Sequence, residues 1–254
     1  MIPNNNLPNL AGDFLRIHRA ITRGLTVGVT RGSDFIRDGF PDQGLQQGFA
    51  LYLQALTAVV SAHHLGEDEI AFPALKQKLP AVPYERLGAD HITIETALGL
   101  VKSTLPELVG ANPAAALVKA VDGIKSILAV WSPHIEVEQT AFSSTAIAGV
   151  MTPAEQAQVA VALAKYSQEH VGPPFFAMPF VLFNLAPADR AEMAAMMPKM
   201  MIQELIPGDW KQKWAPMKPF FLDYIPGCPT ASPAASGSAA RKPGRFTRNG
   251  EKKD

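Results

Sequence analysis

Residues 63–73, HHLGEDEIAFP, decide how the chain folds. They end a stretch in which apolar residues recur every three or four positions, the spacing of one face of an α-helix. The stepping runs through positions 49, 53, 56, 60, 63, 67 and 70. His63 and Glu67 therefore lie one turn apart on the face that points into the core. The pattern predicts a helix with two polar side chains at core positions.

Three other segments show the same helical stepping, and each places a histidine on its apolar face. His18 lies in a stripe with positions 14, 21 and 25, and His91 lies in a stripe that runs from position 87 to 108. The stripe from position 124 to 138 contains both His134 and Glu138. Six polar groups from four helices are therefore predicted to point inward.

Breaks in the pattern separate the four segments. We expect the first segment to end at Gly28, Gly32 and the turn-rich stretch 33–41. Residues 79–83 and 109–113 carry prolines and glycine and separate the later segments. Four long amphipathic helices with short connections predict an all-α protein, an antiparallel up-down four-helix bundle.

Burying these six groups without partners is costly. An unpaired buried carboxylate costs several kcal/mol, and a whole domain is stable by only about 5–15 kcal/mol. A bound cation removes that cost, because neutral imidazole and carboxylate become its ligands. The pattern therefore indicates a metal site in the core of the bundle.

The spacing of the histidines supports convergence at one level of the bundle. His18 and His63 are 45 residues apart, His91 and His134 are 43 apart, and each second histidine has a glutamate four residues later. The chain thus contains a His…His-x-x-x-Glu unit twice, as expected for two helical hairpins related by pseudo-twofold symmetry. Since the helix lengths on either side of each turn are nearly equal, the six groups can meet.

These motifs together resemble those of hemerythrin-like (HHE cation-binding) domains. Residues 63–73 resemble the second-helix motif, Asp90-His91 the third, residues 134–138 the fourth, and residues 17–20 the first. The resemblance covers residues 10–146. It implies a non-haem di-iron centre with two iron ions, bridged by oxo or hydroxo groups and by carboxylates. It also implies roles for the residues, with Glu67 and Glu138 as bridges and the four histidines as terminal ligands: His18, His63, His91 and His134.

One position departs from the oxygen-carrying members of the family. They have a further histidine one turn after the third-helix histidine, and this chain has Glu95 there. Glu95 is either a carboxylate on a solvated face, or a seventh ligand or proton-handling group that makes it a catalytic candidate. A site with less histidine and more carboxylate is less suited to reversible oxygen carriage and favours oxygen activation or peroxide chemistry.

A second histidine, His64, adjoins the motif. It lies about 100° round the helix from His63, so we expect it at the surface or behind the ligands. A shifted register that pairs His64 with Asp68 is the alternative.

The sequence as a whole predicts three parts, the bundle and two segments that follow it. Residues 1–148 form the predicted bundle, and residues 149–226 form a C-terminal helical extension packed on it. The extension has helix starts at Thr152-Pro153 and near Pro187, the second helix running to about Leu205. Its methionines are expected to pack adaptably or to line an apolar channel. Residues 227–254, rich in Pro, Ala, Ser and Gly and then basic, are predicted to be a disordered tail.

Composition narrows the function classes. Lys+Arg and Asp+Glu both number 23, so there is no basic field for nucleic acid. The single cysteine, Cys228, excludes a Cys-rich metal site. The first residues do not resemble a signal peptide and no run is long enough to span a bilayer, so we expect a cytoplasmic protein without a membrane partner.

Two functions compete at this stage. One is a di-iron oxidoreductase that reacts with dioxygen, peroxide or nitric oxide. The other is an oxygen or iron storage or sensing protein without turnover. The expected partner is dioxygen or another small molecule, and the expected state is a monomer or homodimer. The C-terminal extension favours the oxidoreductase over simple oxygen carriage, since it could build a lid or a pocket.

Overall fold

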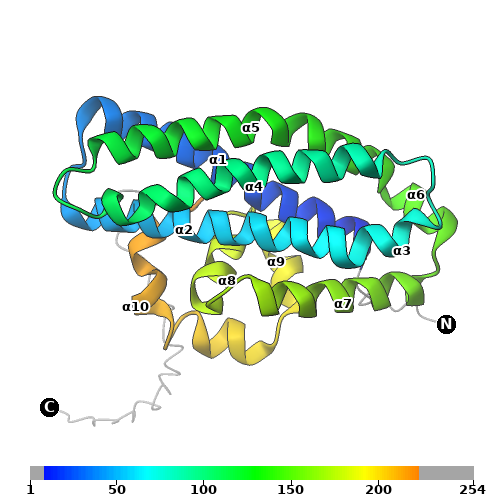
Figure 1. Ribbon diagram of the computed structural model, residues 1–254. Helices are drawn as coiled ribbons and strands as arrows, with labels where there is room; N and C mark the ends of the chain where they lie inside the picture. Colours follow the sequence, from blue (N-terminus) through cyan, green and yellow to red (C-terminus); the bar gives the residue numbers. More distant parts are fainter. Residues whose placement is uncertain (1–8, 223–254) are drawn as a thin grey trace, which may run out of the picture. The chain divides into compact units, whose positions relative to one another are not determined.

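The computed structural model describes residues 9–222, and every element in that range is a helix. Four long helices run side by side (Figure 1) and pack as neighbours in the order α1–α2–α4–α5 and back to α1. Their bounds are Leu10–Asp38 for α1, Gln43–Gly66 for α2, Tyr84–Leu108 for α4 and Ala114–Ala141 for α5. The predicted all-α four-helix bundle is confirmed.

Shorter elements connect and follow these helices. After α2 come a π-helical turn, η1, and a short helix; after α5 come seven further helical elements. Their bounds are η1 Glu67–Ala71, α3 Phe72–Lys76, α6 Ser144–Val150, α7 Pro153–His170, α8 Pro174–Phe183, α9 Pro187–Met196, η2 Met201–Leu205, α10 Lys211–Trp214 and η3 Ala215–Phe220. None of the helices in the described range is long and apolar enough to cross a bilayer.

The first helix is longer than the sequence predicts. Gly28 and Gly32 do not end α1, which continues to Asp38. They allow α1 to approach α5 closely: a Cβ atom at Gly28 would lie 2.9 Å from Ile124 Cδ1, and one at Gly32 would collide with Val121. The expected break there is wrong, because packing against α5 outweighs the low helix propensity of glycine.

The C-terminal extension covers one side of the bundle. Elements α7, α8 and η3 pack on α2, and α7 and α8 also contact α1 (Figure 1). The helix α7 begins as predicted, with Thr152 as N-cap in a capping box with Glu155. The predicted helix up to Leu205 is interrupted after Met196, because Pro198 disfavours helical backbone at the residue before it.

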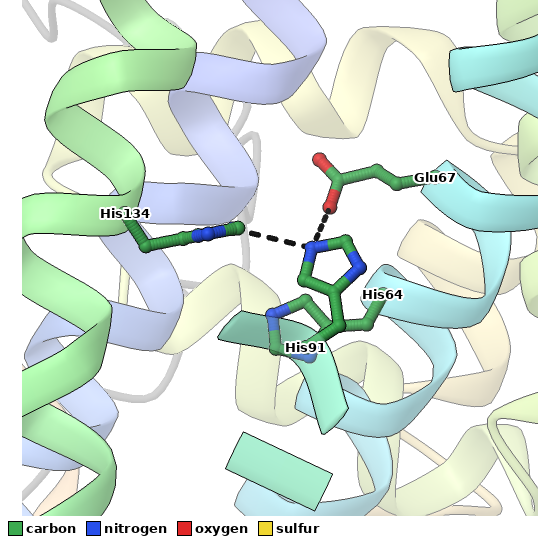
Figure 2. Close-up of side chains that lie close together, drawn as sticks. All are labelled: His64, Glu67, His91 and His134. Atoms are coloured by element: carbon green, nitrogen blue, oxygen red, sulfur yellow. Dashed lines mark hydrogen bonds and ion pairs between the residues drawn. The ribbon is translucent and has the colours of Figure 1, made fainter. Parts of the chain in front are cut away.

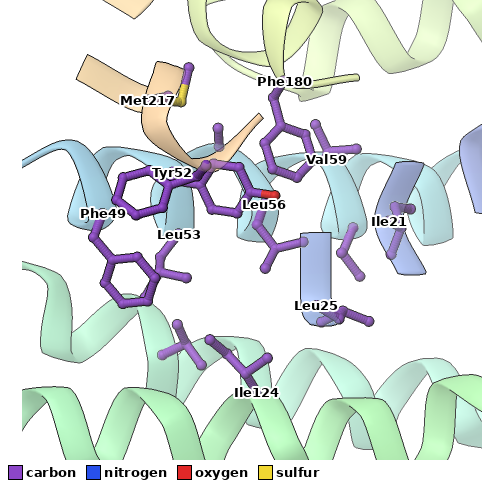
Figure 3. Close-up of a cluster of buried hydrophobic side chains, with 14 of the residues drawn as sticks. Ile21, Leu25, Phe49, Tyr52, Leu53, Leu56, Val59, Ile124, Phe180 and Met217 are labelled. Atoms are coloured by element: carbon purple, nitrogen blue, oxygen red, sulfur yellow. The ribbon is translucent and has the colours of Figure 1, made fainter. Parts of the chain in front are cut away.

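The extension shares the core of the bundle. Figure 3 shows Phe180 of α8 and Met217 of η3 packed over α2, beside Tyr52. The rings of Tyr52 and Phe180 lie 5.0 Å apart. All described residues fall in one compact unit, so the division at residue 148 remains a prediction; α6 runs across it. The predicted tail, with Cys228, lies outside the described residues.

The apolar interior forms two clusters. The larger contains Ile21, Val60, Ile94 and Trp131, and the smaller contains, among others, Phe14, Phe72, Leu87 and Phe142. Each predicted ligand residue is flanked along its helix, or along the segment that continues the helix, by residues of both clusters. On one side lies a residue of the larger cluster, and on the other side lies a residue of the smaller cluster. The polar groups therefore occupy one level of the bundle, closed by apolar side chains above and below.

Candidate metal centre

The structure brings all six predicted ligand residues together in the bundle core. His18 comes from α1, His63 from α2, His91 from α4, and Glu138 with His134 from α5. Glu67 begins the π-helical turn that continues α2. None of the six is more than 6% exposed. Their role as ligands stays a prediction, but the convergence it requires is present.

The candidate ligand atoms form two groups that share Glu67. Within each group, one atom from each residue lies within 4.8 Å of all the others. The first group is His64, Glu67, His91 and His134 (Figure 2). The second group is His18, His63, Glu67 and Glu138.

Both glutamates lie between histidines of the two groups. Glu67 Oε1 is 3.4 Å from His63 Nε2, and its Oε2 is 3.5 Å from His91 Nε2. Glu138 Oε2 is 3.3 Å from His18 Nε2, and its Oε1 is 3.4 Å from His134 Nε2. Each carboxylate thus directs one oxygen to each group, an arrangement suited to a bridging ligand.

The π-helical turn η1 positions the carboxylates at the end of α2. A π-turn widens the helix by one residue and is frequent at functional sites. Here it begins at Glu67 and carries Asp68 to the ring of His91, where Asp68 Oδ1 lies 2.9 Å from His91 Nδ1. The hydrophobic stepping contains no signal for this turn.

Two aspartates orient the histidines of the first group. Asp68 contacts His91, and Asp90 Oδ2 lies 3.4 Å from Nδ1 of His134. With Nδ1 held by a carboxylate, each ring turns its Nε2 atom inward, and the two Nε2 atoms are 3.2 Å apart. Sequence reasoning did not predict that these aspartates contact His91 and His134, because neither aspartate lies on an apolar stripe.

Burial and mutual charge shift the pKa values of the core groups. Burial, followed by the charges of neighbouring histidines, lowers the pKa of His63 and of His64 well below the ordinary value. Burial, followed by the charge of Glu138, raises the pKa of Glu67. Burial also acts to raise the pKa of Glu138, but the nearby imidazole groups of His134 and His18 together outweigh burial and lower that pKa. Without a cation, Glu67 therefore favours the neutral form.

Many polar atoms of the site have no hydrogen-bond partner within the described part of the chain. They are both nitrogens of His18 and of His64, Nε2 of His63, and both oxygens of Glu67 and of Glu138. Buried donors and acceptors are normally paired, and leaving one unpaired costs about 1–3 kcal/mol. Cations at the centre of these lone pairs would satisfy them, so the residues fit a metal.

Comparison with family models agrees with this geometry. The model described as hemerythrin HHE cation-binding domain matches residues 13–144. The chain belongs to the hemerythrin HHE family. No curated protein and no solved structure gave a significant match. The matched range covers α1 to the start of α6 and contains every residue of both ligand groups, whereas α7 to η3 lie beyond it.

His64 is buried within this hemerythrin-like bundle. It is only 1% exposed, its ring stacks on that of His91 at 4.2 Å, and it belongs to the first ligand group. The expected surface position is wrong, and Asp68 pairs with His91 instead of His64. The reason is that α2 packs against both the bundle and the extension, so adjacent positions 100° apart are both buried.

Glu95 lies at the outer edge of the site. Its Oε2 atom accepts a hydrogen bond from Ser61 at 2.8 Å, and its Oε1 atom is 4.0 Å from Nδ1 of His64. Lys102 Nζ is 4.0 Å from Glu95 and donates to Ser61. The Glu95 side chain is 39% exposed, and neither ligand group includes it. In this structure Glu95 faces His64 and solvent, so His64 lies between Glu95 and the predicted metal site.

Proposed function

We propose that this hemerythrin-family protein binds two iron ions and reacts with dioxygen or a related small oxidant such as peroxide or nitric oxide. The observation that carries the proposal is the pair of buried ligand groups with Glu67 in common. Mixed imidazole and carboxylate donors without thiolate suit iron. Two groups of four ligands match two ions better than one tetrahedral zinc.

The two ligand groups assign the candidate ligands to two separate ions. His64, His91 and His134 would hold one ion, and His18 with His63 would hold the other, while Glu67 and Glu138 would lie between them. Iron bound there would supply oxygen binding and redox chemistry. The chain itself excludes bulk water, because apolar clusters close the site at both ends.

The outer residues hold the ligands in place. Asp68 and Asp90 accept the Nδ1 protons of His91 and His134, which keeps Nε2 of each ring free as a lone-pair donor. Glu95 stands in the same relation to His64 at a longer distance, and Ser61 fixes its orientation. We propose that Glu95 is a positioning or proton-holding group on the solvent side and not a ligand.

The test is metal loading followed by exposure to oxygen. Metal-free protein is titrated with ferrous iron under nitrogen, iron and zinc are counted per chain, and oxygen is then admitted with optical monitoring. Two iron ions per chain and a new absorption band on oxygenation are expected. A single zinc without iron after iron-replete expression would refute the proposal.

The same experiment separates turnover from storage. A band that disappears when oxygen is removed indicates a carrier or sensor. A transient band that decays while product forms indicates an enzyme. We favour turnover, because the extension adds to the bundle a cavity that reaches the site, as described below.

A further inference from the structure

A cavity of about 320 Å³ lies between the bundle and the C-terminal extension. Its inner wall comes from α1 and α2, including Ile17 and Val59. Its outer wall comes from α7, α8, α9 and η2, elements that lie beyond the range matched by the family model. The extension therefore builds a feature that the bundle alone lacks.

The cavity reaches the candidate metal centre at one residue. His63 lines the cavity and also belongs to the second ligand group. It is 6% exposed, whereas the other residues of the two groups are 2% exposed or less. The cavity is thus where the site comes closest to the outside, and a molecule in it would lie beside His63.

The walls of the cavity are apolar and adaptable. Five methionines line it, together with aliphatic side chains from α2 and α7. They are Met178, Met193, Met196, Met197 and Met201. Thioether side chains are flexible and polarisable, so they adjust to ligands of varied shape. Such walls favour a molecule with little polar surface.

Asp13, the one carboxylate that the described residues contribute to the cavity wall, is already paired. Asp13 Oδ1 accepts a hydrogen bond from Arg16 at 2.6 Å, and Arg16 also binds Glu192 at 2.6 Å. Ser167 and Gln168 are the neutral polar residues of the wall. Since no lysine or arginine of residues 9–222 lines the cavity, none of these residues would compensate the burial of an anion there.

We propose that this cavity binds an uncharged, largely apolar organic molecule of roughly ten non-hydrogen atoms and holds it beside His63. The size follows from the cavity volume, since one water molecule occupies about 30 Å³ of liquid. The identification of that molecule as a reactant rests on the proposed di-iron function. The binding itself does not, so it can be tested on the metal-free protein.

The first experiment measures binding of straight-chain alcohols to the metal-free full-length protein by calorimetry. Affinity should rise about fourfold with each added methylene from 1-butanol and then level off once the cavity is full. Octanoate at neutral pH should bind more weakly than 1-octanol, because its charge must be buried. Equal affinities for octanoate and 1-octanol, or no dependence on chain length, would overturn the proposal.

Two alanines of α7 supply a matched pair of variants. Ala164 lines the cavity and Ala162 does not, although both are exposed on the same helix. Ala164→Trp should place an indole ring in the cavity and weaken 1-octanol binding by about tenfold or more. Ala162→Trp should bind 1-octanol as the wild type does. If both variants bound 1-octanol with the same affinity, whether unchanged or equally weakened, the proposed position of the molecule in the cavity would be overturned.

The last measurement locates the molecule relative to the metals. In protein loaded with ferrous iron under nitrogen, NMR signals of bound 1-octanol should broaden more than in zinc-loaded protein. Equal broadening would contradict a position beside His63. Iron content should be the same in Ala164→Trp and the wild type. If iron fails to bind while 1-octanol binds as predicted, the di-iron function is wrong and the cavity proposal stands.

Discussion

The two ligand groups differ in what lies behind them. In the first group, Asp68 and Asp90 hold the rings of His91 and His134 from outside. In the second group, both nitrogens of His18 are without a hydrogen-bond partner among the described residues, and His63 backs onto the apolar cavity. The two proposed metal positions are therefore unequal. We expect tighter, better-ordered binding at the first and easier access at the second.

The largest effect should come from the residue that both groups share. Glu67→Gln should abolish binding of both ions and with it the stabilisation by metal, about 2.7 kcal/mol for each ion at a free metal concentration near 100 times Kd. Unfolding measured with added metal and with chelator gives this difference. Glu69→Gln, an exposed neighbour in the same turn, is the control.

The same variant should have the opposite effect on the metal-free protein. Burial and the charge of Glu138 raise the pKa of Glu67 above its ordinary value of 4.5. A group with a raised folded-state pKa adds stability below its unfolded pKa, and that stability is lost as pH rises through the folded value. At neutral pH, Glu67→Gln should therefore stabilise the metal-free protein. A lower Tm than the wild type under chelator would contradict this account.

Removing a single histidine from either group should halve the metal content. His64→Ala should lose the ion of the first group and His18→Ala that of the second, so that each variant binds one iron per chain. The exposed His170 at the end of α7 provides the control, and His170→Ala should keep both ions. Two ions retained in His64→Ala would remove His64 from the ligand set and return it to a supporting role.

The aspartates behind the first group should have a smaller effect. Asp68→Asn and Asp90→Asn should weaken binding of one ion by about 10–100-fold without loss of the other. The effect should be larger for Asp68, which lies 2.9 Å from its histidine, than for Asp90 at 3.4 Å. Competition with a chelator of known affinity measures both, and Asp122→Asn on the exposed face of α5 is the control. Equal weakening of both ions would contradict the inequality of the groups.

Glu95 should have the smallest effect on metal content. Glu95→Gln should retain both ions, because Glu95 contacts His64 only at 4.0 Å and lies outside both groups. Its effect, if it handles protons, should be seen in the autoxidation rate and the reduction potential. Glu107→Gln, exposed on the same helix, is the control. Loss of an ion in Glu95→Gln would make Glu95 a ligand.

The helical stepping predicted the bundle and the inward direction of six polar residues. It succeeded because each of these residues lies on the apolar face of a long helix, where local periodicity and tertiary burial agree. It left a surface position open for His64, which is wrong, because a single stripe describes a helix packed on one side and α2 is packed on two. It ended α1 too early because glycine propensity carries no information about the close approach of α5.

By itself, the sequence determined the four helices, their turns and the residue types that meet at one level, since helical period and chain length are local properties. The tertiary structure decided which atoms share a group. The π-turn at Glu67, the pairing of Asp68 with His91 and the cavity behind His63 all depend on helices that are distant in the chain. Side-chain contacts between such elements leave no periodic trace in the sequence, because each is set by packing at one place and not by a repeat.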